Sequence, residues 1–165
     1  VMCAVAVSEA IEELCNVNCS IKWVNDIYIG DKKVCGILTE AISDFESGRV
    51  DAIIVGIGIN LTTEIFPEEL KGIAASVGMK LDRCALVADI YSRLKALCDT
   101  LPEKQFMDKY REYSLVLGKT VTFNRNGRDY NALADAINDN GELEVILDSG
   151  ERMILNSGEI SVKLA

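Results

Sequence analysis

Apolar side chains recur every three or four residues over two stretches of this chain, and this spacing predicts amphipathic helices. The first stretch covers residues 1–15 and has acidic residues between its apolar positions. The second covers residues 83–101, and Pro102 then opens a shorter helix at residues 103–113. The chain is therefore expected to contain two long helices, one near its start and one past its middle, and a third short one.

Residues 21–61 instead show short apolar runs broken by turn residues, a pattern typical of β-strands. The expected strands cover residues 21–23, 27–29, 34–42 and 52–61, with breaks at Asn25-Asp26, at Gly30-Asp31 and at a charged turn over residues 46–49. The last run is a continuous series of Ile and Val, which is typical of a strand covered on both faces. We therefore expect residues 52–61 to form the most buried strand, followed by an irregular segment at 62–80.

From Leu117-Gly118 onwards the chain changes to short strands of Thr, Val and Tyr. Turn signals separate these strands at Asn126-Gly127, Asn140-Gly141, Ser149-Gly150 and Ser157-Gly158. Such frequent turns predict a small all-β module that closes its own edges as a barrel. The sequence thus predicts an α+β fold: a mixed β-sheet with packed helices in residues 1–115, and a small barrel in residues 116–165 that docks on the larger part.

Composition narrows the chemistry that this chain can perform. Among its 165 residues there is no histidine, which excludes His-based general bases, Ser-His-Asp and Cys-His nucleophiles and most zinc geometries. The formal net charge of −9 argues against nucleic-acid binding, because that function needs a basic surface. No apolar run reaches the roughly 18 residues that a membrane-spanning helix requires, so we expect no membrane partner.

The six cysteines predict reduced, buried thiols and not a disulfide framework. They show no Cys-x-x-Cys spacing, and several fall within the apolar helical or strand patterns. Reduced thiols are typical of the cytoplasm, where we expect the protein to act.

Two segments carry residues that are unusual for plain structure. The first joins Lys22-Trp23-Val24-Asn25-Asp26 to Lys33 and Gly36 through the expected hairpin. A lysine ammonium and a glycine that admits close backbone approach suit an anionic ligand. A hairpin with solvated lysines and a turn-forming Asn-Asp pair explains the same residues, so both interpretations stay open on this pattern alone.

The second segment is Gly56-Ile57-Gly58-Ile59-Asn60, at the end of the Ile/Val strand. Glycine weakens a strand, so two at alternate positions indicate either a bend or the close approach of a ligand to the sheet. The amide of Asn60 could then bind an adenine edge, because it both donates and accepts hydrogen bonds. The motif is not the dinucleotide fingerprint, which has a third glycine and a following helix.

Together these segments resemble the core motifs of biotin protein ligases, in the same order and at similar separations. The resemblance rests on Lys22-Trp23-x-Asn25-Asp26, Lys33-x-x-Gly36-Ile37-Leu38-x-Glu40 and Gly56-x-Gly58-Ile59-Asn60. It continues through Ala75-Ser76 and Leu81-Asp82-Arg83, and then through Leu117-Gly118-Lys119, the turn at 138–141 and Ser157-Gly158-Glu159-Ile160-Ser161, which are similar to the family's SH3-like C-terminal barrel. The likeness covers nearly the whole chain.

The resemblance implies an ATP-dependent biotin–[carboxyl carrier protein] ligase. In such an enzyme biotin and ATP form biotinyl-5′-AMP with the help of Mg²⁺, and biotin then passes to a lysine of a biotin carboxyl carrier domain. It implies Lys33 as the catalytic ammonium and Asp26 as the group that orients or deprotonates the acceptor lysine. Biotin or adenylate binding is implied for Lys22, Asn25, Gly36, Ile37, Leu38, Gly56, Gly58 and Asn60. No residue is expected to be a direct metal ligand.

The chain departs from the family pattern in two respects. Val24 stands where the family usually has proline, and the glycine- and arginine-rich loop that closes over biotin and the phosphates is not found in these residues. We therefore expect this chain to be a fragment that does not complete adenylation by itself. A lipoate or octanoate ligase is the alternative enzyme, and a non-catalytic dimerisation or interaction module is the alternative outside enzymes. Homodimer formation is left open.

Overall fold

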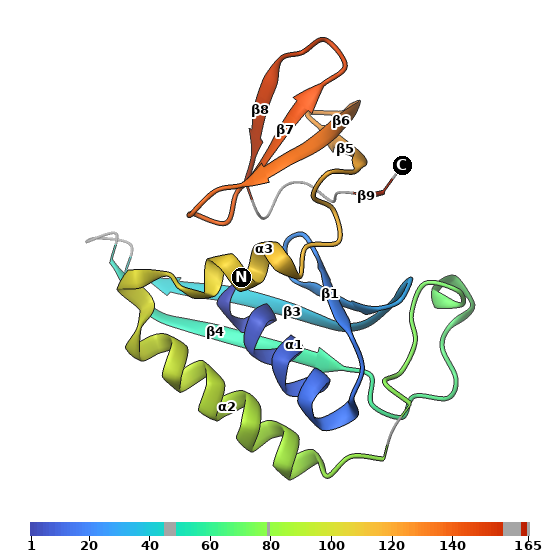
Figure 1. Ribbon diagram of the computed structural model, residues 1–165, viewed down its shortest axis with the longest axis vertical. Helices are drawn as coiled ribbons and strands as arrows, with labels where there is room; N and C mark the ends of the chain where they lie inside the picture. Colours follow the sequence, from blue (N-terminus) through green and yellow to red (C-terminus); the bar gives the residue numbers. More distant parts are fainter. Residues whose placement is uncertain (45–48, 79, 157–162, 165) are drawn as a thin grey trace.

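The protein consists of a larger α+β part and a smaller β part that stands at one end of it (Figure 1). The structure is a computed structural model, and it describes residues 1–44, 49–78, 80–156 and 163–164. Helices and strands follow one another along the larger part, and only strands follow in the smaller part. The predicted α+β class is confirmed.

The larger part is built on a four-stranded sheet with the order β1-β2-β3-β4, whose ladders are all antiparallel in the described residues, so the prediction of a mixed sheet is wrong. Its strands are β1 (Cys19–Lys22), β2 (Asp26–Ile29), β3 (Lys32–Ser43) and β4 (Val50–Ile59). Because each strand pairs with its neighbour in sequence, the order requires only hairpin connections. Parallel pairing is limited, in the described residues, to isolated bridges from Ile21 to Ser114 and from Lys33 to Ala74.

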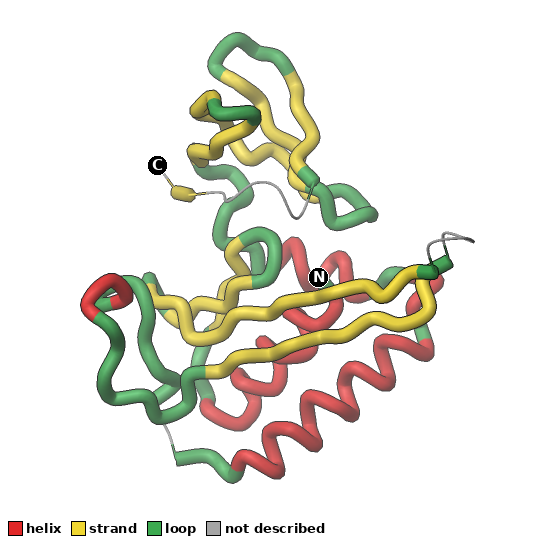
Figure 2. The backbone as a smooth tube through the Cα atoms, turned by 180° about the vertical axis from the view of Figure 1, so that it is seen from behind, coloured by secondary structure: helices red, strands yellow, loops and turns green. Residues whose placement is uncertain are grey.

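Three helices lie on one face of this sheet, as the view from behind makes clear (Figure 2). They are α1 (Met2–Cys15), α2 (Arg83–Asp99) and α3 (Phe106–Glu112). Helix α1 is central, because it contacts α2, α3 and β1. Its residues Val5, Val7, Ala10 and Ile11 are almost fully buried, so the predicted helical periodicity corresponds to the core-facing side. Asp82 caps α2 by accepting a hydrogen bond from the Cys84 amide.

Helix α3 begins later than its sequence pattern predicts. A 3₁₀ turn, η2 (Leu101–Glu103), precedes it, and Lys104 then adopts a left-handed conformation with φ of 50°. A left-handed residue ends a helical turn, so the regular helix restarts only at Phe106. The irregular segment predicted at 62–80 contains a further 3₁₀ turn, η1 (Glu68–Leu70).

The prediction that residues 52–61 form the most buried strand is wrong. Strand β4 is largely exposed: Ile53 is 63% exposed and Ile54 is 52% exposed. Among the described strands β4 pairs only with β3 and forms the edge of the sheet. The pattern of Ile and Val correctly indicates two apolar faces, but apolarity does not reveal whether another element covers them. The buried strand positions lie instead in β1 to β3, for example at Ile27 and Val34.

The cysteines are all unpaired, as predicted, but they are not all buried. Cys15, Cys19 and Cys35 belong to the core, whereas Cys84 and Cys98 are exposed. Both exposed thiols lie on α2, whose buried positions are Leu86 and Ile90. The burial prediction fails there because most of the surface of α2 faces away from the core.

The smaller part is a five-stranded antiparallel sheet with the order β8-β7-β6-β5-β9. Its strands are β5 (Thr120–Arg125), β6 (Arg128–Ile137), β7 (Leu143–Leu147), β8 (Arg152–Leu155) and β9 (Lys163–Leu164). The turns predicted at Asn126-Gly127, Asn140-Gly141 and Ser149-Gly150 join successive strands. The turn signal at Ser157-Gly158, with the motif that continues to Ser161, lies outside the described residues.

Side chains of helix α3 and its N-terminal turn bind the turn between β6 and β7. The Arg111 guanidinium donates to the carbonyl oxygen of Ile137 at 2.8 Å and pairs with the carboxylate of Asp139. The Lys104 ammonium donates to the carbonyl oxygen of Asp139 at 2.9 Å. The two parts are thus joined by charge-assisted hydrogen bonds to a turn, as well as by the chain itself. None of the helices in the described ranges combines the length and the apolar character needed to cross a membrane.

Charged side chains also tie the helices of the larger part together. Arg93 of α2 bonds Glu9 and Glu13 of α1 as well as Asp89 of its own helix, and it is only 22% exposed. Lys109 of α3 pairs with the same Glu9, so one carboxylate links three helices. Because Arg93 is partly shielded from water and shared among several carboxylates, its ion pairs are expected to contribute more than an isolated surface pair does.

We predict that Arg93→Ala lowers the free energy of unfolding by about 1–2 kcal/mol, because several charge-assisted hydrogen bonds are lost together. Urea denaturation followed by circular dichroism measures this change. Arg152→Ala is the matched control, since Arg152 is 67% exposed and pairs only with Asp135 among the interactions described. The control is expected to stay within about 0.5 kcal/mol of the parent, and equal losses in both variants would contradict the prediction.

Candidate functional site

The face of the sheet opposite the helices carries an open cavity of about 510 Å³ over β2, β3 and β4. Its lining consists of Asp26, Lys33, Gly36, Ile37, Leu38, Gly56, Ile57 and Gly58. Side chains alternate between the two faces of a strand, so Gly56 and Gly58 face away from the side on which α2 packs near Ile57 and Ile59. The cavity floor is therefore made of backbone at the glycines and of the Leu38 side chain, with charged groups at one end.

An ion pair between Lys33 and Asp26 forms the charged end of the cavity. The Lys33 Nζ and Asp26 Oδ1 atoms are 2.6 Å apart, and the two side chains are 36% and 31% exposed. Asp26 begins β2 and lies directly opposite Gly36 of β3. A Cβ atom at position 36 would lie 3.2 Å from the Lys33 Nζ and 3.3 Å from its Cε. The ammonium thus lies over Gly36, and glycine leaves it the space to do so.

The backbone of Lys33 is fixed from two directions. It is the second residue of β3, opposite Tyr28, and it also bridges to the segment after η1. Its amide donates to the carbonyl oxygen of Ile73, and its carbonyl oxygen accepts from the amide of Ala75, each at 2.9 Å. Both backbone groups are satisfied by a segment distant in sequence, so the lysine stem starts from a well-defined position.

Glycines face one another across the middle of the cavity floor. Gly36 is opposite Gly58, and Leu38 is opposite Gly56. A Cβ atom at Gly58 would meet only the Gly36 carbonyl oxygen at 3.8 Å, and one at Gly56 only the Leu38 carbonyl oxygen at 3.9 Å. Nothing in the protein requires glycine at these two positions on steric grounds. The resulting strip is flat and open, and a planar or ring-shaped group can approach its backbone closely.

Asn25 fixes the corner beside the ion pair. Its side-chain amide donates to the carbonyl oxygen of Ile37, which belongs to the cavity lining. Two further contacts reach this corner from outside the sheet: the Tyr110 hydroxyl donates to the Val24 carbonyl oxygen, and the Trp23 indole N–H donates to the Gly141 carbonyl oxygen. The turn that carries Asn25 and Asp26 is thus held by groups from three parts of the chain.

Two further titratable groups near the ion pair, Cys35 and Tyr28, stay neutral at neutral pH. Burial raises the pKa of the Cys35 thiol to about 12, and the charge of Asp26 raises it further while Lys33 opposes the shift. Burial, together with Asp26, also raises the pKa of Tyr28. A thiol with so high a pKa is no nucleophile at neutral pH. The described part of the chain also holds no group of three or more acidic or cysteine side chains that could bind a metal.

The structure brings most of the predicted site residues together. Lys33 and Asp26 share the cavity with the predicted binding residues of β3 and β4, and Asn25 bonds its rim. Lys22 and Asn60 do not line the cavity. Lys22 faces Asp26 across the β1–β2 ladder, and Asn60 uses its backbone amide and carbonyl to bond Val34 and Val77.

Sequence reasoning missed Ile57, Trp23 and Tyr110. Ile57 lines the cavity, and its position between two glycines is the signal that could have identified it. For Trp23 the position inside the first motif was a signal, but its partner in the β6–β7 turn was not evident. Tyr110 had no such signal, since nothing in the pattern of its own helix links it to the corner.

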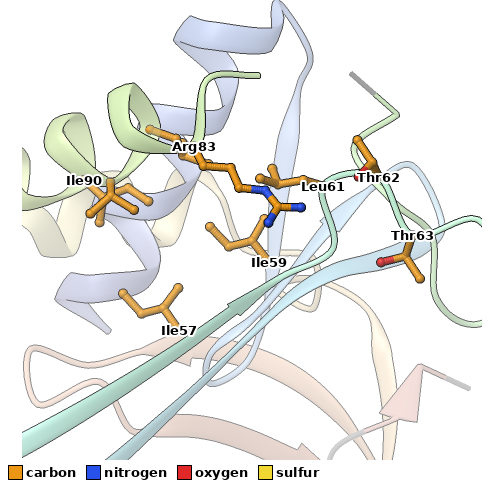
Figure 3. A pocket seen from close by; sticks show the side chains of 9 residues that line it. Ile57, Ile59, Leu61, Thr62, Thr63, Arg83 and Ile90 are labelled. Atoms are coloured by element: carbon orange, nitrogen blue, oxygen red, sulfur yellow. The ribbon is translucent and has the colours of Figure 1, made fainter. Parts of the chain in front are cut away.

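A second, more apolar groove of about 540 Å³ lies between the end of β4 and helix α2 (Figure 3). Ile57, Ile59 and Ile90 line it, and the Arg83 side chain reaches from the start of α2 toward the segment at Leu61. Arg83 is the one charged side chain of its lining. The groove therefore lacks the paired acid and base that the first cavity offers, and we take the cavity over Gly36 as the candidate site.

Comparison with protein families matches both parts of the chain. Residues 1–60 match the biotin/lipoate A/B protein ligase family, and residues 116–163 match the biotin protein ligase C-terminal domain. The first match contains Asp26, Lys33 and Gly36. The second begins just before β5 and runs through the smaller sheet.

Curated relatives agree with these matches. A bifunctional ligase/repressor BirA of Bacillus subtilis is 42% identical over 118 residues, which cover 68% of this chain and 32% of that protein. A biotin–[acetyl-CoA-carboxylase] ligase of Mycobacterium tuberculosis is 29% identical over 148 residues, which cover 85% of this chain and 52% of that protein. The chain thus spans about a third to a half of the length of these relatives.

A solved structure extends the match over the whole fold. The biotin protein ligase of Aquifex aeolicus in complex with biotin and ATP superposes with a TM-score of 0.83 at 28% identity, covering 99% of this chain and 70% of that one. Its apo structure superposes with a TM-score of 0.84 at 29% identity. The family matches, the relatives and the superposition agree on both parts. This chain therefore belongs to the biotin protein ligase family.

Proposed function

We propose that this chain carries the adenylate-binding half-site and the C-terminal domain of a biotin–[carboxyl carrier protein] ligase that acts in the cytoplasm. The observation that carries the proposal is the Lys33–Asp26 ion pair, held over Gly36 at one end of a glycine-floored cavity. An ammonium beside a flat, partly apolar floor suits a ligand with a ring system at one end and an anionic group at the other. Biotinyl-5′-AMP has this character.

In the first step a carboxylate oxygen of biotin attacks the α-phosphorus of ATP. The bond to the bridging oxygen breaks, pyrophosphate leaves, and a mixed acyl phosphate anhydride remains. Negative charge accumulates on the α-phosphate oxygens, where the Lys33 ammonium stabilises it electrostatically. Asp26 keeps that ammonium over Gly36, so its position does not have to be established during the reaction.

In the second step the amine of an acceptor lysine attacks the acyl carbon, and AMP leaves. The incoming amine must be neutral to act as a nucleophile. Asp26 is placed to accept its proton or to orient it, because its carboxylate lines the same cavity as Lys33. The acceptor that we propose is a lysine of a biotin carboxyl carrier domain.

Mg²⁺ would be held mainly by the nucleotide's phosphate oxygens. The cavity offers a single carboxylate, that of Asp26, and Mg²⁺ in nucleotide sites is often bound by one or two carboxylates together with phosphates. This donor set fits a metal that arrives with ATP and supplies charge neutralisation. The ammonium of Lys33 and the backbone of the glycine strip remain the chain's own contribution.

The same cavity could serve a lipoate ligase, since the family matched by residues 1–60 includes both activities. The C-terminal match at residues 116–163 favours biotin, because it is specific to biotin protein ligases. A competition experiment with biotin and lipoate against labelled biotinyl-5′-AMP separates the two possibilities.

We predict that Lys33→Ala weakens binding of biotinyl-5′-AMP by about 10- to 100-fold, because a charge-assisted hydrogen bond to the phosphate is lost. Isothermal titration calorimetry on the chain measures the affinity. Lys32→Ala is a matched control: Lys32 is the adjacent lysine, but it pairs with Asp31 at 2.9 Å and does not line the cavity.

The control variant is expected to bind like the parent. Equal effects of the two substitutions on the affinity would contradict a specific role of Lys33 in binding biotinyl-5′-AMP. If the parent chain shows no binding of biotinyl-5′-AMP while its circular dichroism indicates a folded protein, the proposed function itself is contradicted.

We further predict that Gly58→Ala lowers the affinity for biotinyl-5′-AMP without lowering the stability of the chain. The added methyl group makes only an ordinary contact with the Gly36 carbonyl oxygen at 3.8 Å. Replacing glycine in an unstrained strand position is therefore expected to leave the free energy of unfolding unchanged or to raise it by up to about 1 kcal/mol. The methyl group projects into the cavity, however, so the affinity for biotinyl-5′-AMP is expected to fall. Unchanged affinity would mean that the glycine strip does not contact the ligand.

A further inference from the structure

The turn between β1 and β2 is held from outside the sheet by two buried donors. The Tyr110 hydroxyl on α3 donates to the Val24 carbonyl oxygen at 2.7 Å. The Trp23 indole N–H donates to the carbonyl oxygen of Gly141, in the β6–β7 turn of the smaller part, at 2.9 Å. Tyr110 is 1% exposed and Trp23 is 5% exposed. The Trp23 bond is buried and the Tyr110 bond is partly buried, so both are shielded from bulk water at least in part. They enclose the residues directly before Asn25 and Asp26.

These bonds connect the candidate site to elements that do not line it. Asp26 has to face Lys33 across the hairpin, and Asn25 has to reach the Ile37 carbonyl oxygen. Asn25 belongs to a three-residue connection, residues 23–25, and Asp26 follows it directly as the first residue of β2, paired with Lys22. The position of the connection is therefore set in large part by what holds Trp23 and Val24.

We propose that Tyr110 and Trp23 are positioning residues: they hold the Asn25–Asp26 corner where Asp26 meets Lys33, and through Trp23 the smaller part supports the corner directly. The importance of this for ligand binding rests on the proposed function. The geometric role does not, because it concerns the corner in the free protein. Helix α3 and the β6–β7 turn act together in this role, since Arg111 and Lys104 also join them.

A purely structural role is the competing explanation, because any buried donor needs a partner. Such a role predicts a general loss of stability when the donor is removed. A positioning role predicts in addition a local loosening of the corner. The chain offers a control that separates the two: the Tyr113 hydroxyl donates at 2.6 Å to the Glu12 carboxylate of α1, away from the corner.

The first measurement is amide hydrogen exchange in the ligand-free chain, followed by mass spectrometry or NMR. Tyr110→Phe removes only the hydroxyl group and is expected to speed exchange of the Asn25 and Asp26 amides about fivefold or more, the equivalent of one hydrogen bond. Trp23→Phe is expected to act in the same direction. Tyr113→Phe is expected to leave these amides unchanged. Exchange in β7 serves as the internal reference for global stability.

Trp23 supplies a second signature, because it is the one tryptophan of the sequence. Its indole N–H gives a single NMR resonance, which reports the bond to Gly141. In the parent chain this proton is expected to exchange slowly with solvent. Rapid exchange in a folded parent chain would overturn the part of the proposal that concerns Trp23.

The second measurement is the affinity for biotinyl-5′-AMP. Tyr110→Phe is expected to weaken binding about fivefold, and Tyr113→Phe is expected to leave it unchanged. Unchanged exchange at the corner in Tyr110→Phe overturns the proposal, whatever the affinity. Faster exchange with unchanged affinity overturns the link between corner and site. Faster exchange in a chain whose parent does not bind the probe supports the positioning role and contradicts the proposed function instead.

Discussion

The candidate site depends on one electrostatic contact, the ion pair of Lys33 with Asp26 over a position that has no side chain. The lysine ammonium is partly exposed, so water alone would leave it mobile. Asp26 restricts it by charge, and Gly36 supplies the space beneath it. Glycine suits this position because a Cβ there would lie 3.2 Å from the Lys33 Nζ, and the ammonium would then have to shift. The site therefore requires the charge of Asp26, the space at Gly36 and the strand register that sets them opposite each other in the β2–β3 hairpin.

The register explains why residues from separate motifs meet. Antiparallel pairing sets Asp26 against Gly36, and Gly36 in turn against Gly58. One residue of slippage would turn every side chain to the other face of the sheet. Burial of β1 to β3 against the helices opposes such a slip, since Ile27, Val34 and Cys35 are buried on the core side. The hydrophobic core thus fixes the alignment of a polar site that it does not contain.

Local sequence patterns predicted the helices and strands well, because helical spacing, strand runs and turn residues each depend on a few neighbouring residues in the sequence. They also singled out Lys33, Gly36 and Gly58, which the structure places in the lining of one cavity. They failed where the outcome depends on distant parts of the chain. The exposed residues of β4 show this, since two apolar faces are visible in the sequence but the covering elements are not. Tyr110 shows it as well: its partner Val24 lies 86 positions away, and no periodicity links them.

The two parts of the chain form one connected structural unit at the β6–β7 turn. Three side chains, Arg111, Lys104 and Trp23, bond backbone carbonyl oxygens of residues 137–141. Every residue of a turn has a backbone carbonyl oxygen, so these acceptors cannot be recognised from the amino-acid sequence. Their positions depend on the backbone conformation of the turn. The bond from Trp23 that supports the corner therefore depends on the backbone conformation of the β6–β7 turn, whereas the ion pair of Arg111 with Asp139 depends on a side chain. Gly141, with φ of +80°, provides that conformation.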